Sequence, residues 1–213
     1  MSDIVLSVDQ TIAEIPVVEN GEPLVDLDTV DALRVERRPD SAAPGVSLRL
    51  GLVDRLIAAQ TLLPAGLLLL VVDGHRPLTD QRRRLATALD ELRRARPDWS
   101  EEKVRATVRQ RVQPGEFGSH LTGGAVDLTL CHRSGEPLWL GSALHTGPEA
   151  SSGACYAASP VVSPDARARR LIIRQALAAV DLVNRPTAWW HWSYGDRYWA
   201  YVCGAESARY GPV

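Results

Sequence analysis

The sequence predicts an α+β fold in which helices flank a central, mostly antiparallel sheet. Two observations predict this class. Stretches with apolar residues at helical spacing are interspersed with short apolar runs of strand length. The most informative polar motif lies directly before one of these runs, where a turn enters a strand. With 213 residues, 45% of them hydrophobic, the chain is expected to form one well-buried domain over 1–213.

The first part of the chain, 1–46, carries the weakest signals and is expected to form an N-terminal flap or edge segment. Thr11–Val18 has the composition of a short strand, and Leu33–Glu36 alternates like one. Pro39–Gly45 is expected to be a loop. The N-terminus has neither a basic region nor a long apolar stretch, so no signal peptide is expected.

Three helices and one buried strand are expected next. Leu48–Leu63 and Thr79–Arg96 carry apolar residues at helical spacing. Leu67–Val72 between them is a continuous apolar run, as expected of a strand that is buried on both faces. Ser100–Val112 starts like a capping box and predicts the third helix.

The C-terminal part is expected to contain a strand, a long loop, a helix and a hairpin. These are, in order, Ala125–Cys131, Leu138–Gly153, Asp165–Val183, and the strand pair Trp189–Trp192 with Tyr198–Cys203. The length of the loop and its place after a strand indicate a substrate-binding loop.

The polar motif runs from Gly118 to Asp127. His120 and Asp127 are seven residues apart, which is too far for a shared helical face but suits a turn that enters a strand. Gly123 and Gly124 supply the turn, because glycine adopts backbone angles that other residues resist. Imidazole and carboxylate are suitable Zn²⁺ ligands. An ordinary hydrogen-bonded pair in a turn would use the same two residues.

A second stretch, Ala188–Trp192, sets His191 among three tryptophans. Such an aromatic wall excludes water and holds the imidazole in one rotamer. A histidine in an aromatic core is the alternative interpretation. If the stretch is a strand, Trp190 and Trp192 face away from Trp189 and His191.

Taken together, the two stretches predict one metal site. His120, Asp127 and His191 would bind one Zn²⁺ per chain. Two histidines and one carboxylate leave a fourth zinc position open, which is the arrangement of catalytic rather than structural zinc.

These motifs resemble those of the VanX-type zinc D,D-dipeptidases, in the group that also holds D-Ala-D-Ala carboxypeptidases and the hedgehog signalling domain. Gly118–Asp127 matches the family signature SxHxxGxAxD except at its first position, and Ala188–His191 matches ExWH except at the Glu. A strand followed by DG(Y/H)RP is the third marker, present at Asp73–Pro77. The resemblance runs from about Val46 to Val202. It implies a zinc metallopeptidase that hydrolyses D-Ala-D-Ala or a similar small dipeptide.

The resemblance also implies roles for two further positions. Arg76 matches the family arginine that polarises the scissile carbonyl, and a fixed guanidinium donates where negative charge develops. An ion pair with Asp73 is the alternative interpretation of Arg76. Ala188 stands where the family has its Glu general base, and a methyl group cannot transfer a proton.

Three explanations of Ala188 are open. It is an engineered substitution that traps substrate, or the mark of a natural pseudoenzyme, or the mark of a metalloenzyme that draws its base from elsewhere. The intact Arg76 and aromatic wall favour the first. A metal- and ligand-binding module on the same fold, as in the hedgehog case, is the alternative from another functional class.

Substrate contacts are expected from three residues. A dipeptidase must bind a free amine, and in the VanX type a carboxylate in the loop Leu138–Gly153 does so. The natural register puts His145 at that position, which leaves Glu149 as the candidate acid and His145 as a pocket-lining residue. Ser119 could hydrogen-bond a substrate, or act only as a turn hydroxyl.

Charge and cysteine content limit the partners. The net charge of −2 and the lack of a basic patch argue against nucleic-acid binding. The longest apolar run, Leu62–Val72, is too short to cross a membrane. Cys131, Cys155 and Cys203 lack paired spacing, which favours a reducing compartment and predicts a cytoplasmic protein. A small peptide is thus the expected partner, and the oligomeric state is left open.

Overall fold

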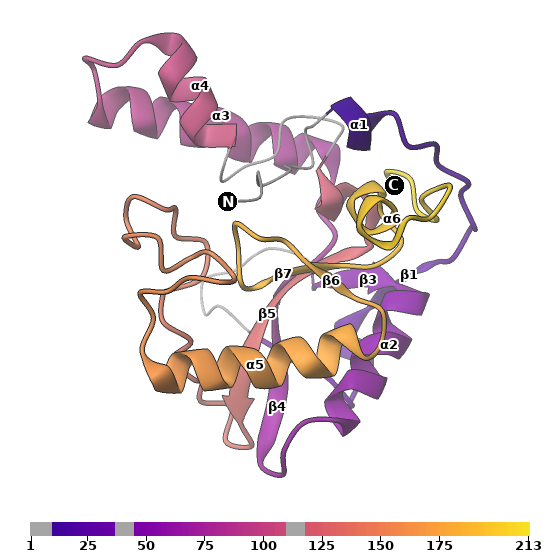
Figure 1. Cartoon of the computed structure of the whole chain (residues 1–213). Helices are drawn as coiled ribbons and strands as arrows, with labels where there is room; N and C mark the ends of the chain where they lie inside the picture. The colour runs from indigo at the N-terminus through magenta and orange to yellow at the C-terminus, as the bar shows by residue number, and fades with distance from the viewer. Residues whose placement is uncertain (1–9, 37–44, 110–117) are drawn as a thin grey trace.

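The computed structural model describes residues 10–36, 45–109 and 118–213. Its centre is a five-stranded sheet in the order β2-β4-β5-β7-β6 (Figure 1). The strands are β2 (Arg34–Val35), β4 (Leu67–Asp73), β5 (Ala125–His132), β7 (His191–Ser193) and β6 (Val183–Asn184). β2 runs parallel to β4, and the other three pairings are antiparallel, which confirms the predicted mostly antiparallel sheet. β1 (Leu24–Asp26) and β3 (Ser47–Arg49) form a separate antiparallel pair.

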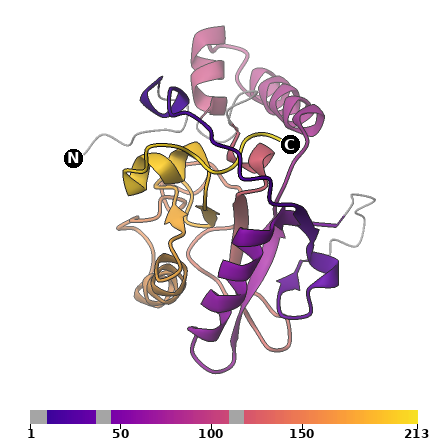
Figure 2. The same ribbon diagram turned by 90° about the vertical axis from the view of Figure 1, so that its right-hand side faces the viewer.

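Helices flank the central sheet, as the predicted α+β class requires. They are α1 (Gln10–Ala13), α2 (Leu50–Thr61), α3 (Leu78–Ala95), α4 (Glu101–Arg109), α5 (Pro164–Ala178) and α6 (Arg197–Cys203), with 3₁₀ turns η1 (Leu27–Thr29) and η3 (Ser119–Thr122). α2 and α5 contact each other, and α3 packs on α4 beyond one end of the sheet (Figures 1 and 2). Of the helices in the described part of the chain, none has the length and apolar content needed to span a bilayer.

The two faces of β5 differ in character because successive side chains of a strand point to opposite sides. Val126, Leu128 and Leu130 are fully buried in the main apolar cluster, which also contains side chains of α2 and α5. Asp127 alternates with them and therefore points to the opposite face. On β5, one face thus joins the main apolar cluster, and the other face carries Asp127.

Two predictions in the N-terminal half are wrong. Thr11–Val18 is not a strand, because residues 10–13 form α1 and Val17 makes only an isolated bridge to Ala208. The helix predicted from Leu48 begins two residues later, because Leu48 pairs with Val25 in the β1–β3 ladder. The predicted strands at Leu33–Glu36 and Leu67–Val72 are confirmed as β2 and β4. In this way 1–46 supplies an edge strand.

The C-terminal hairpin is also predicted wrongly. Tyr198–Cys203 belongs to helix α6, because the Asp196 side chain caps it by accepting from the Trp199 N–H and Gly204 ends it in a left-handed conformation. The preceding strand begins only at His191, so the expected alternation does not extend over Trp189–Trp190.

The other helix predictions differ from the structure mainly at their ends. The helix predicted over Asp165–Val183 stops at Ala178, and Val183 starts β6. The helix Thr79–Arg96 is confirmed as α3. The predicted end of the next helix at Val112, most of the loop Pro39–Gly45 and the N-terminal residues up to 9 lie outside the described residues.

The long loop after β5 is fastened to α5 by a buried arginine, Arg170. Its Nε donates to the Leu140 carbonyl at 2.7 Å, and its two terminal nitrogens donate to the carbonyls of Ala154 at 2.7 Å and Tyr156 at 2.8 Å. The guanidinium carbon also lies 5.2 Å from the centre of the Trp189 ring. Burial lowers the pKa of Arg170 to about 10, so the group stays charged at neutral pH.

Arg170→Gln should lower the free energy of unfolding by about 2–4 kcal/mol, because buried carbonyl groups would lose their donors. Urea unfolding followed by circular dichroism measures the change. Arg174→Gln, at an exposed position one turn later on α5, is the matched control and should change it by less than about 0.5 kcal/mol. Equal effects of the two substitutions would show that Arg170 does not fasten the loop.

Candidate metal centre

Three separate segments bring His120, Asp127 and His191 together. η3 carries His120, and β5 and β7 carry the other two as direct partners in the antiparallel ladder. Cross-strand partners project from the same face of a sheet. One ligand atom from each of the three side chains lies within 4.8 Å of the other two, and all three residues are buried. The sequence motif and the sheet register therefore converge on one place.

The turn between η3 and β5 depends on Gly123. Its φ of +69° lies in the left-handed region, which glycine adopts without strain. A Cβ at this position would lie 2.4 Å from the Leu24 side chain. The Gly123 carbonyl also accepts from the Arg49 N–H at 2.9 Å, which joins the turn to the start of α2. The position of His120 is thereby fixed relative to β5.

One of the distances among the three side chains matches the ligand separation of a tetrahedral ion, and the other is that of a hydrogen bond. His120 Nε2 lies 3.4 Å from Asp127 Oδ1, and His191 Nδ1 lies 2.8 Å from the same oxygen. Ligands about 2.0–2.1 Å from a tetrahedral zinc ion are about 3.3 Å apart. His120 Nδ1 donates to the Gly74 carbonyl at 2.7 Å, so its Nε2 carries the lone pair that a metal needs.

The protonation states also suit metal binding. Burial acts to raise the pKa of Asp127, but the charge of His120 and hydrogen bonds from three histidines outweigh it and hold that pKa well below its usual value. Burial lowers the pKa of His191, although Asp127 opposes this. An ionised carboxylate and a neutral imidazole are the forms that ligate metals.

His145 is the loop residue that the structure brings to this cluster. Its Nε2 lies 2.9 Å from Asp127 Oδ2, the oxygen that faces away from His191. Its backbone is left-handed, with a φ of 62°, and its ring packs edge-on against Trp190. Asp73 lies close to both His145 and Asp127. The sequence interpretation treated Asp73 only as a partner of Arg76, although its place in the DG(Y/H)RP marker was a signal for the site.

Arg76 lies at the same site, held from two sides. Its Nη1 donates to Gln81 Oε1 at 2.7 Å, its Nη2 pairs with Asp73, and its N–H donates to the His120 carbonyl at 3.0 Å. Arg84 also contacts Asp73, at 2.9 Å. Burial acts to raise the pKa of Asp73, but the charges of His120 and Arg76 outweigh it and lower that pKa. The ion pair considered for Arg76 is present, and it fixes the guanidinium beside the ligand candidates.

Ala188 lies in a turn that leads into β7. Its N–H donates to the Arg185 carbonyl at 3.0 Å, and its carbonyl accepts from the His191 N–H at 3.0 Å. Its side chain is partly buried against the main apolar cluster. Position 188 is thus tied through the backbone to a metal-ligand candidate.

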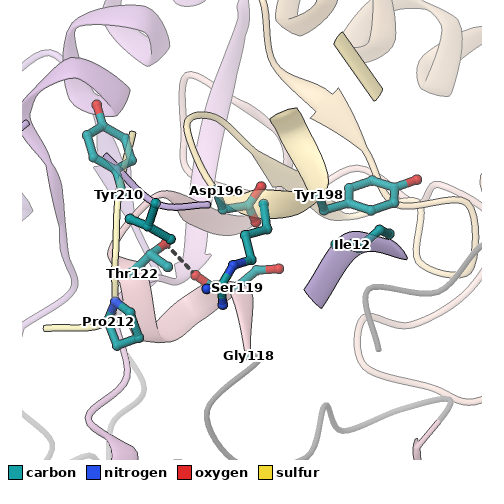
Figure 3. Close-up of a pocket in the computed structure, with 10 residues that line it drawn as sticks. Ile12, Gly118, Ser119, Thr122, Asp196, Tyr198, Tyr210 and Pro212 are labelled. Atoms are coloured by element: carbon teal, nitrogen blue, oxygen red, sulfur yellow. Dashed lines mark hydrogen bonds between the residues drawn. The ribbon is translucent and has the colours of Figure 1, made fainter. Parts of the chain in front are cut away.

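The structure places Ser119 and Glu149, the two other predicted substrate contacts, in surroundings that differ from those of His120, Asp127 and His191. Ser119 is buried and lines a hollow with Thr122, Asp196 and Tyr198, in which the Thr122 hydroxyl donates to the Ser119 carbonyl (Figure 3). The lining of this hollow does not include the three ligand candidates. Glu149 forms an exposed ion pair with Arg96, near the C-terminal end of α3.

Comparison with known proteins places the chain in a family. Residues 51–203 match the peptidase M15 family described as D-Ala-D-Ala dipeptidase. A D-alanyl-D-alanine dipeptidase of Synechocystis sp. is 24% identical over 221 residues, which cover 88% of this chain and 87% of that protein.

Two solved structures share a more distant likeness, each at 16% sequence identity. One is a mutant of the vancomycin-resistance D,D-pentapeptidase VanY in complex with Zn(II), with a TM-score of 0.39 over 76% of this chain and 78% of that chain. The other is VanYB in complex with D-alanine-D-alanine, with a TM-score of 0.41 over 89% of this chain and 92% of that chain. The family match covers most of the sequence, and the chain therefore belongs to peptidase family M15, the D-Ala-D-Ala dipeptidases.

Proposed function

We propose that the protein is a zinc-dependent dipeptidase for D-Ala-D-Ala, or for a similar small dipeptide that contains D-amino acids, and that Ala188 makes it slow. The convergence of His120, Asp127 and His191 carries this proposal. Membership of the M15 family supports peptide hydrolysis. The name of the Synechocystis relative supports the choice of D-Ala-D-Ala.

The donor set of this site fits one zinc ion per chain. Two imidazole nitrogens and one carboxylate oxygen are a ligand set of catalytic zinc, and they leave a position for the reactants. When bound, zinc supplies Lewis acidity at the scissile carbonyl and a lowered pKa for water.

The protein groups then position and polarise the substrate. Arg76 uses one N–H toward Gln81 and one toward Asp73, and a guanidinium has five. The remaining donors are available for the oxygen of the scissile carbonyl, where negative charge develops. A guanidinium that is already fixed needs no reorganisation for this task.

Proton transfer is the step for which this chain lacks its usual group. In the VanX-type pattern a carboxylate at position 188 takes a proton from water and returns it to the leaving amine, and Ala188 can do neither. This substitution favours a second candidate function, a protein that binds metal and a peptide ligand without turnover. The two candidates share the metal site and differ only in the rate of cleavage.

The loop after β5 supplies the nearest substrate contact. His145 lies against Asp127, whereas Glu149 is engaged by Arg96 at the surface. We therefore assign contact with the substrate to His145 before Glu149. The buried hydroxyl of Ser119, one residue before His120, is a weaker candidate for the same role.

Metal analysis tests the proposal. The purified protein should contain about one zinc per chain, and His120→Ala with His191→Ala should reduce this to nearly none, because one carboxylate alone is a poor site. His132→Ala, at the exposed end of β5, is the control and should keep the metal. Full zinc content in the double variant, measured by plasma mass spectrometry, would exclude these ligands.

A further inference from the structure

A row of polar residues crosses the sheet at the metal centre. Asp73 pairs with Asp127, and Asp127 pairs with His191. The ladder continues beyond β6, because the Arg185 N–H donates to the His191 carbonyl at 3.0 Å. Cross-strand partners share a face and lie about 4.5–5.5 Å apart at their Cβ atoms. Arg185 is therefore the fourth member of the row, next to His191.

The side chain of Arg185 is buried, and one of its guanidinium nitrogens lacks a partner among the described residues. The residue is 9% exposed, and its Nε has no hydrogen-bond partner in the described part of the chain. Burial lowers the pKa of Arg185, and the charges of Asp127, Tyr198 and Asp196 act in the opposite direction. An arginine does not give up its proton in a protein, so the cation persists. A buried cation without a counter-ion is unfavourable.

The acidic groups nearby do not form an ion pair with Arg185 within the described part of the chain. Both oxygens of Asp127 face histidines. Asp196 Oδ1 accepts from the Ser193 hydroxyl and the Trp199 N–H, and its Oδ2 is buried without a hydrogen-bond partner among the described residues.

Arg170 shows how this chain satisfies a buried guanidinium when its role is structural. All three of its nitrogens donate to backbone carbonyls at 2.7–2.8 Å. Arg185 is buried to a similar degree, yet among the described residues its Nε has no carbonyl to donate to. The described residues therefore leave Arg185 Nε free to donate to a ligand.

We propose that Arg185 binds a carboxylate of the ligand beside the metal centre, namely the C-terminal carboxylate of a short peptide. A guanidinium binds a carboxylate through two parallel hydrogen bonds. In a dipeptide the carboxylate lies one residue beyond the scissile carbonyl, about 3.8 Å along the chain, which suits neighbouring positions of the ladder. The choice of a peptide carboxylate rests on the proposed function. The site would select ligands with a free C-terminus.

Binding of a matched ligand pair tests the assignment. Zinc-loaded protein is titrated by calorimetry with D-Ala-D-Ala and with its C-terminal amide. The acid should bind about 10–100-fold more tightly, as charge-assisted hydrogen bonds imply. Arg185→Gln should abolish this preference and leave the affinity for the amide unchanged, and Arg185→Lys should retain part of it. Arg174→Gln, at an exposed position on α5, is the control and should keep the full preference. An undiminished preference in Arg185→Gln would overturn the proposal.

A second measurement separates this inference from the dipeptidase function. Acetate is titrated into zinc-loaded protein with ¹⁵N-labelled arginine, and the Arg185 Nε–H resonance, assigned by its absence in Arg185→Lys, should shift to saturation. A saturable shift without any binding of D-Ala-D-Ala would support the anion site and reject the dipeptide as its ligand. Binding of D-Ala-D-Ala without a shift by either ligand would reject Arg185 alone. The resonance is measured on the unaltered guanidinium, so this test holds even if Arg185→Gln fails to fold.

Discussion

Ala188→Glu is expected to raise the rate of D-Ala-D-Ala hydrolysis by about 10²–10⁴-fold, the usual contribution of a positioned acid–base group. The backbone between position 188 and His191 forms a hydrogen-bonded turn, so a side chain at 188 starts close to a metal-ligand candidate. Position 188 is only partly buried, which leaves room for a longer side chain. The original protein should bind zinc and cleave very slowly.

The rate is measured by ninhydrin and mass spectrometry against a panel of L,L-, L,D- and D,D-dipeptides. Ala188→Gln is the matched control, because it has the size of Glu but cannot accept the proton, and it should stay slow. The pH profile of the Glu variant should gain an acidic limb, since the base works only when ionised. A folded, zinc-loaded Glu variant that cleaves no dipeptide would reject the peptidase function in favour of ligand binding. Equal rates before and after the substitution would place the base elsewhere.

Arg76→Lys, made in the Ala188→Glu background, should keep the fold and the zinc but lose about 10²–10³-fold in rate, the scale of one lost oxyanion donor. Lysine keeps the charge but lacks the planar fork that lets Arg76 hold Asp73 and Gln81 while donating to a substrate. The loss should fall on kcat rather than KM, because the interaction grows in the transition state.

Arg84→Lys is the control for this experiment. Arg84 also contacts Asp73, yet it is much more exposed than Arg76, and its replacement should change the rate only a few-fold. Full activity in Arg76→Lys would show that the guanidinium serves only its ion pair. Equal losses in both variants would point to Asp73 as the group that matters.

The sequence predicts the sheet better than its surroundings. The apolar run at Leu67–Val72 and the strand at Ala125–Cys131 follow from hydrophobic pattern alone, because both strands are buried in the centre. Tyr198–Cys203 is wrongly predicted as a strand because its aromatic and β-branched residues favour strands. The cap at Asp196 and tertiary packing stabilise a helix there instead. Leu48 is wrongly predicted as helical, because its pairing with Val25 in the β1–β3 ladder cannot be recognised from the local sequence.

Part of the candidate site can likewise be predicted from the sequence, and part cannot. The grouping of His120, Asp127 and His191 is predictable because these residues lie in two recognisable motifs, Gly118–Asp127 and Ala188–His191. Arg185 was missed because it lies in an Asn-Arg-Pro sequence that indicates only a break, and its place opposite His191 depends on strand register. Register is set by tertiary pairing rather than by local composition.

The opposed faces of β5 also bear on when metal can be captured. Asp127 and His191 are 64 residues apart in the chain, and their ligand atoms meet only after β5 and β7 have paired. The apolar side chains of β5 that alternate with Asp127, namely Val126, Leu128 and Leu130, belong to the main apolar cluster and point to the other face. Small zinc domains depend on their ion to fold. In this chain we expect the sheet to form without zinc, so a chelator should remove the metal and leave the sheet folded.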